Sequence, residues 1–191
     1  LTELSSSVFK GTGALTSINI PSSIVSVGYE AFKDSGLISL VIPDSVQVIA
    51  DRAFSGAPIQ SLTLGTSLAV WANTTNDRDP FYGVCSTLVS AEINVSEIPA
   101  HAFDGCSKLT SLTLDNNVNR IGTAAFSNAS SLEELAIPDS VTTLGSSSFS
   151  GASSLKKIVI PDSVMTLGSN SFNGASALES AVLGSGLTEL S

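Results

Sequence analysis

Positive charge is scarce in this sequence, and the scarcity excludes several classes of partner. Its 191 residues include eight lysines and arginines against 17 aspartates and glutamates, a formal net charge of −9 at pH 7. Binding to nucleic acid requires a basic patch that neutralises phosphates. An anionic membrane surface attracts the same kind of basic cluster. The composition therefore argues against both partners.

Long apolar runs and catalytic motifs are lacking as well. Mean hydropathy is positive, at +0.35, yet no run approaches the roughly 20 apolar residues of a membrane-spanning helix. We therefore predict no membrane insertion within this segment. The sequence holds one histidine, and it has no Gly-x-Ser-x-Gly, Gly-rich phosphate loop or His-rich metal motif. We predict a protein that is not an enzyme, with no cofactor and no metal site.

The histidine, His101, occupies a slot two residues before a phenylalanine. Glu30, Arg52, Ala124 and Ser147 fill the equivalent slot elsewhere. A general base needs a nucleophile or a metal beside it, and none is indicated here. We interpret the slot as solvated and permissive.

What the sequence does have is an internal repeat. All eight phenylalanines fall in one series with spacings of 22 or 23 residues and one of 27: Phe9, Phe32, Phe54, Phe81, Phe103, Phe126, Phe149 and Phe172. After each comes a pattern such as Leu155, Ile158 and Ile160. The last two of these positions are two apart, as on one face of a strand. A turn such as Pro161-Asp162-Ser163 and a second apolar pair complete the unit.

The period of about 23 residues lies in the range of leucine-rich repeats. Such a unit is too short to bury its own apolar face, so stacked neighbours supply the core. We predict a repeat solenoid, with a parallel β-sheet on one face and short strands, turns and 3-10 segments on the other. It forms a single segment over residues 1–191, with about eight repeats and an irregular stretch at 65–100. Since both ends lie in the same phase of the repeat, we expect a piece of a longer chain.

One run carries a family resemblance, SFSGASSLKKIVIPDSVMTLGSNSF at 148–172. It resembles the BspA-like leucine-rich repeats of bacterial and protozoan surface proteins, and the resemblance extends along the whole chain. It implies a solenoid at the cell surface or secreted, with a role in adhesion or protein binding. The leading hypothesis is therefore a module that binds a protein ligand of a host or the extracellular matrix. Two alternatives remain: a structural stalk or spacer, and a polysaccharide-binding surface.

The irregular stretch gives the first candidate site. Extra polar residues lie between Trp71 and Phe81, and polar loops on rigid scaffolds often carry function. The candidate binding residues are Trp71, Asn73, Asp77, Arg78, Asp79 and Tyr82. The alternative is a tolerated insertion, with Trp71 filling a core position. Two aspartates are too few oxygen ligands to predict a calcium site.

The strand face gives the second candidate site. Two positions of each predicted strand face solvent, and on most units they hold small uncharged residues. The candidates for ligand contact are Ser111, Thr113, Glu134 and Lys157. Glu133 and Glu134 are adjacent on one strand and so face opposite sides, which does not fit a catalytic pair. The alternative is that these residues only suit strands.

Two cysteines, Cys85 and Cys106, occupy the same register in adjacent repeats. Stacked positions are about 4.8 Å apart, within the range of a disulfide. The alternative is two buried thiols, and alanine in the same column of other repeats, at 129, 152 and 175, favours it. Asn-x-Ser/Thr sequons occur at Asn73, Asn94 and Asn128, and they matter only in a glycosylating pathway.

Overall fold

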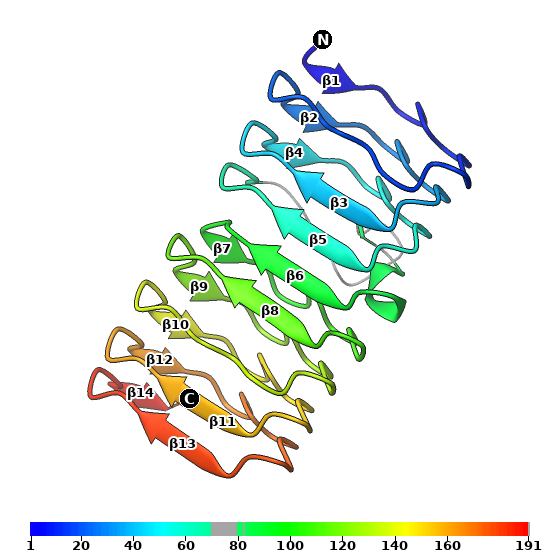
Figure 1. Ribbon diagram of the computed structural model, residues 1–191. Coiled ribbons are helices and arrows are strands. Elements are labelled where there is room, and N and C mark those ends of the chain that lie inside the picture. Colours follow the sequence, from blue (N-terminus) through cyan, green and yellow to red (C-terminus); the bar gives the residue numbers. More distant parts are fainter. Residues whose placement is uncertain (70–79, 82, 191) are drawn as a thin grey trace.

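The chain winds into a β-solenoid of about seven turns of about 23 residues each. The computed structural model describes residues 1–69, 80–81 and 83–190. Figure 1 shows the turns stacked in sequence order from the N-terminus to the C-terminus. The sequence predicts about eight units because it contains eight phenylalanines. Eight phenylalanines enclose seven intervals, which correspond to the seven turns.

The longer strands lie side by side on one face of the solenoid, here called the strand face (Figure 1). Four of them form one parallel sheet: β3 (Ser39–Ile42), β5 (Ser61–Leu64), β6 (Ser90–Ile93) and β8 (Ser111–Leu114). Two more form a separate pair: β11 (Lys157–Ile160) and β13 (Ser180–Leu183). Their register pairs each residue with the same repeat position one turn on, as Ser90 with Ser111. The predicted columns are therefore the columns of the structure.

The opposite side is built from two-residue strands and turns, as predicted. One parallel sheet contains β1 (Glu3–Leu4), β2 (Ser26–Val27) and β4 (Val48–Ile49). Another contains β7 (Glu97–Ile98), β9 (Arg120–Ile121), β10 (Thr143–Leu144), β12 (Thr166–Leu167) and β14 (Glu189–Leu190). The described residues include one 3-10 turn, η1 (Val84–Ser86). No helix in this part of the chain is long and apolar enough to cross a membrane.

A ladder of stacked phenylalanine rings runs through the core. The ring centroids of Phe103 and Phe126 lie 5.2 Å apart, and those of Phe126 and Phe149 lie 5.3 Å apart. The rings are within 6° of parallel in both pairs. Each ring thus fills the space that the neighbouring turn leaves, which is why the phenylalanine series has no gaps.

The slot two residues before each phenylalanine corrects the sequence interpretation. Its backbone is left-handed in every described turn, at Ser7, Glu30, Arg52, His101, Ala124, Ser147 and Asn170. Glu30 and Ala124 are also buried. At most of these residues the left-handed bend directs the N–H along the stack, as where Ala124 N donates to Ser146 O over 2.9 Å. The slot is therefore a structural corner that is not wholly solvated, although residues of very different chemistry occupy it.

Candidate functional site on the strand face

In the first turn residues 17–20 form no named strand, and within the solenoid the strand face is interrupted again at residues 133–137. This segment forms no named strand and makes one isolated parallel bridge, between Glu134 and Lys157. It therefore stays attached to β11, while the four-stranded sheet ends at β8 (Figure 1). The apolar pattern is intact here, because Leu135 and Ile137 are buried. Its Glu-Glu-Leu-Ala composition is poor in the residues that favour strands, which gives a local reason for the break.

A hollow of about 660 Å³ lies over this break. Its walls come from residues 110–112, from residues 133–137, and from Lys156, Lys157 and Val159. The core is slightly opened beneath it. Leu112 and Leu135 are 9% and 8% exposed, whereas Leu40 in the same column is 1% exposed. The hollow therefore combines apolar side chains with a charged rim.

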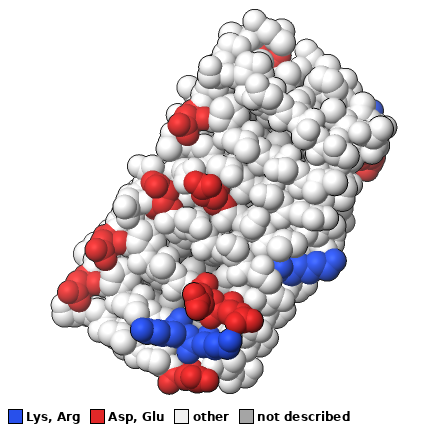
Figure 2. Space-filling view, in the orientation of Figure 1, with Lys and Arg blue, Asp and Glu red and all other residues white. Residues whose placement is uncertain are grey.

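The rim places acids on one turn and bases on the next. Glu133 and Glu134 both line the hollow beside Lys156 and Lys157, so the expectation that they face opposite sides is wrong, because residues 133–137 form no named strand. Lys156 Nζ lies 2.6 Å from Glu133 Oε2, and both side chains are more than half exposed. The hydrogen bond between them, and then their mutual attraction, lowers the pKa of Glu133 and raises the pKa of Lys156. Figure 2 shows acidic and basic side chains gathered at this place, whereas the other charged side chains on this face lie apart and are mostly acidic.

All four strand-face candidates lie where the columns place them. Ser111, Thr113, Glu134 and Lys157 are exposed. Ser111, Glu134 and Lys157 line the larger hollow. Thr113 and Ser111 also line a smaller hollow of about 190 Å³, on the side toward β5 and β6. The structure thus brings these candidates into one continuous surface.

The other group of candidate residues belongs to the irregular stretch at 65–100. Trp71, Asn73, Asp77, Arg78, Asp79 and Tyr82 all lie outside the described residues. The sequon at Asn73 lies there too, whereas Asn128 is exposed and Asn94 is half-buried. The loop therefore stays a prediction from the sequence.

A disulfide joins Cys85 to Cys106 across adjacent turns. Their Cα atoms are 4.1 Å apart, as the shared register requires. The alanines of this column had favoured two unlinked thiols, and that interpretation is corrected here. Alanine fills the column elsewhere because a small side chain fits it, and two stacked cysteines fit it equally well. The bridge ties η1, which follows the irregular loop, to the regular turn beyond it.

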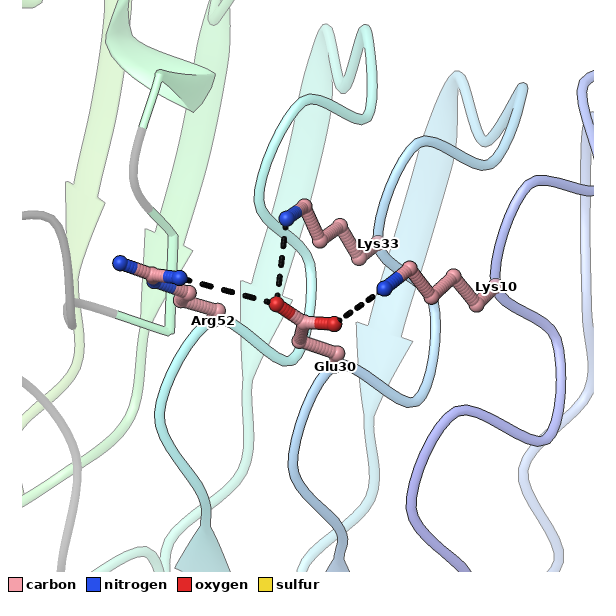
Figure 3. A network of polar contacts seen from close by, with 4 residues as sticks. All are labelled: Lys10, Glu30, Lys33 and Arg52. Atoms are coloured by element: carbon pink, nitrogen blue, oxygen red, sulfur yellow. Dashed lines mark hydrogen bonds and ion pairs between the residues drawn. The ribbon is translucent and has the colours of Figure 1, made fainter.

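A second charged cluster centres on Glu30 (Figure 3). Its side chain is only 6% exposed, and Lys10 Nζ lies 2.5 Å from Oε2. Lys33 Nζ and an Arg52 guanidinium nitrogen lie 3.1 Å and 3.7 Å from Oε1. The hydrogen bonds from Lys10 and then Lys33 lower the pKa of Glu30 to about 2. Because Lys10, Glu30 and Arg52 come from successive turns, we interpret the cluster as a structural staple.

Sequence reasoning missed this staple, although a signal was present. Among the described residues of this slot, Glu30 is the single acid. Lys10 lies on the turn before it and Arg52 on the turn after it. His101, in the same slot, has Nδ1 3.3 Å from Asp104 Oδ2. Within the described residues, no three histidine, cysteine or acidic side chains are grouped to hold a metal ion.

The stacked register, the phenylalanine ladder and the strand face define a leucine-rich-repeat solenoid. The sequence matches the BspA type leucine rich repeat region in six copies, over residues 2–77 and 74–191. The chain therefore belongs to this family. None of the curated proteins matches the chain.

Solved structures of bacterial leucine-rich-repeat proteins share the fold. A leucine-rich repeat protein from Bacteroides ovatus is 23% identical, with a TM-score of 0.52, over 95% of this chain and 70% of its own. A leucine rich cell surface protein from Faecalibacterium prausnitzii is 19% identical, with a TM-score of 0.52, over 96% of this chain and 57% of its own. The leucine rich repeat protein of T. pallidum is 30% identical, with a TM-score of 0.55, over 75% and 57%. The chain thus spans less than two thirds of the last two.

Proposed function

We propose that this segment is a non-catalytic protein-interaction module, exposed at a cell surface or secreted, that binds a protein ligand through its strand face. The observation that carries the proposal is the hollow over residues 133–137. It is the place between β8 and β11 where the sheet is broken and a charged rim surrounds apolar side chains.

The composition of the hollow suits a protein surface better than a small molecule or a glycan. Protein interfaces combine an apolar centre with a polar rim. Leu112, Leu135 and Val159 supply apolar contact here, and Glu134 and Lys157 supply charge of both signs. Sugar rings usually stack on aromatic side chains, and the larger hollow has none. The charged rim adds selectivity, because it rejects partners of the wrong charge pattern.

The family and one solved relative support the proposed location. The solved relative from F. prausnitzii is a cell surface protein, and BspA-like repeats are often surface interaction modules. A protein of a host or of the extracellular matrix is the proposed ligand. A disulfide between adjacent turns supports an oxidising location, because such bonds persist mainly outside the cytosol.

The test is direct binding of the purified segment to a panel of extracellular-matrix proteins, with insoluble glycans alongside. Ala136→Trp places a bulky ring over the hollow without touching the buried core, since Ala136 is exposed. Val41→Trp is the matched control, because Val41 occupies the same column and is also exposed. We expect Ala136→Trp to weaken binding tenfold or more (about 1.4 kcal/mol) and Val41→Trp to leave it unchanged.

Other outcomes separate the rival functions. Binding that survives Ala136→Trp but is lost on deletion of residues 72–80 assigns the site to the irregular loop. Retention on insoluble glycans supports a polysaccharide-binding surface. Binding to nothing in the panel supports the stalk or spacer.

A further inference from the structure

We infer that the strand face around the hollow also binds a second copy of this chain, in an antiparallel arrangement with two-fold symmetry. This inference rests on the proposed function, because it names a partner for the same protein-binding face. The acids and bases of the rim are arranged so that they complement those of a second copy. Binding to an unrelated protein does not require this property.

Two acids stand on one turn and two bases stand at the same positions of the next. Glu133 is one turn from Lys156, and Glu134 is bridged to Lys157. A two-fold axis that lies in the interface, parallel to the strands and between these two turns, exchanges the turns. Glu133 and Glu134 of one copy then face Lys156 and Lys157 of the other, while Glu179 lies opposite the uncharged Thr110. Such a two-fold contact uses the same patch on both subunits.

The charges also select this axis over the alternative. A two-fold axis along the stack would place Glu133 opposite Glu134 of the second copy, and Lys156 opposite Lys157. Like charges facing one another across an interface are strongly unfavourable. The antiparallel stack is therefore the arrangement that the array permits.

The shape of the face agrees with the same axis. In the column of the third strand residue, the small Ala136 is followed one turn on by the larger Val159, with Thr113 before it and Val182 after it. The axis places Val159 of the second copy over Ala136, and Val182 of the second copy over Thr113. Val159 and Val182 are 44% and 50% exposed. The exposed Val159 side chain of each copy thus lies over the small Ala136 in the hollow of the other.

The ion pair within each copy does not prevent the contact. Glu133 and Lys156 are 60% and 57% exposed while paired. An ammonium group has three donors and a carboxylate accepts at two oxygens, so each can pair across the interface as well. The copies overlap over the four turns that begin near residues 110, 133, 156 and 179. A contact of this extent belongs with the small, transient interfaces below about 1,200 Å², so the dimer is concentration-dependent and weakened by salt.

The test is sedimentation equilibrium of the segment over a rising concentration series, at low and high salt. Two charge variants are compared with the parent. The acidic variant carries Lys156→Glu and Lys157→Glu, and the basic variant carries Glu133→Lys and Glu134→Lys. Arg120→Glu is the control, because Arg120 is exposed on β9, away from the strand face.

The expected result is a reversible dimer for the parent and for Arg120→Glu, and monomers for each charge variant alone. An equimolar mixture of the two variants should form a heterodimer, which also shows that both are folded. Because the substituted residues are exposed, circular dichroism should match the parent. A parent that stays monomeric throughout, or variants that self-associate as the parent does, would overturn the inference.

The two proposals fail separately. If the parent is monomeric but binds a panel protein and Ala136→Trp abolishes that binding, self-association is wrong and the proposed function stands. If the parent neither dimerises nor binds, both are wrong. Dimerisation without any panel binding retains the strand face as an interface between copies and removes the matrix ligand.

Discussion

Lys10 and Glu30 are 20 residues apart in the sequence, yet Lys10 Nζ lies 2.5 Å from Glu30 Oε2. The pair joins the first described turn to the second, and Lys33 and Arg52 add two further contacts to the same carboxylate. A carboxylate this well paired stabilises the solenoid only while it is ionised.

Replacing Glu30 with glutamine should therefore lower the melting temperature at neutral pH. The pKa of Glu30 is lowered from 4.5 to about 2. A lowered pKa contributes stability above the unfolded value, and that stability is lost as the pH falls through the folded value. The difference in melting temperature between parent and Glu30→Gln should thus shrink between about pH 4.5 and pH 2. Thermal melts across a pH series measure it.

Glu97→Gln is the control for this staple. Glu97 also pairs across turns, with Arg120 Nε 3.4 Å away, but both side chains are about 60% exposed. Exposed pairs contribute little to stability, so this variant should melt close to the parent. Equal losses in the two variants would show that burial of Glu30 is not the reason for its effect.

Removing a rung of the aromatic ladder should cost far more than an exposed charge. Phe126 is fully buried between Phe103 and Phe149. Phe126→Ala leaves a cavity and should lower the free energy of unfolding by about 3–5 kcal/mol. Phe172 is only half-buried, so Phe172→Ala should cost less. Urea unfolding compares the two, and a larger loss at Phe172 would contradict the ladder as the continuous core.

Gly122 and Gly105 test two different reasons for a glycine: close approach of the neighbouring backbone at Gly122, and a left-handed backbone at Gly105. A Cβ at Gly122 would lie 2.6 Å from Ala100 N and 2.7 Å from Pro99 C, so the neighbouring backbone would have to move. A Cβ at Gly105 meets nothing within 4 Å, but its φ is +78°. Gly105→Ala should cost about 1–2 kcal/mol from the left-handed conformation alone. Gly122→Ala should cost more, and unfolding curves that reverse this order would contradict the spacing of the turns.

Reduction should destabilise the turns on either side of the disulfide. Cys85 and Cys106 are 21 residues apart, and a loop of that size corresponds to roughly 3 kcal/mol in the chain-entropy account. The melting temperature should fall when reductant is added. The double variant Cys85→Ala and Cys106→Ala should melt like the reduced parent and should not respond to reductant. A response of the double variant would assign the effect to something other than the bridge.

Most of the fold was predictable because each column of the repeat has its own chemistry. The phenylalanines, the strand pattern such as Leu155, Ile158 and Ile160, and the short turns repeat at one period. A parallel stack is the arrangement in which all these columns are buried together. The register of the strands then follows, and with it the exposure of Ser111, Thr113, Glu134 and Lys157.

The break and the corners were not predictable from those columns. Leu132, Leu135 and Ile137 keep the apolar pattern, so periodicity predicts a strand here. In the structure, this segment makes a single bridge, from Glu134 to Lys157. What differs is the Glu-Glu-Leu-Ala composition, which is poor in strand-favouring residues and which the apolar columns do not report. The left-handed corners were not predicted for a related reason. Hydrogen bonding between turns imposes the backbone conformation there, and residues as different as Glu30 and Ala124 adopt that conformation.

The most direct test of the central claim places a photo-crosslinking phenylalanine analogue at Ala136, with the same analogue at Val41 as the control. Both positions are exposed in one column of the strand face, but only Ala136 lines the hollow. The account predicts a covalent adduct, with a panel protein or with a second copy of the chain, from position 136 and little from position 41. Equal adducts from the two positions, or none from position 136 under conditions in which the segment binds, would contradict it.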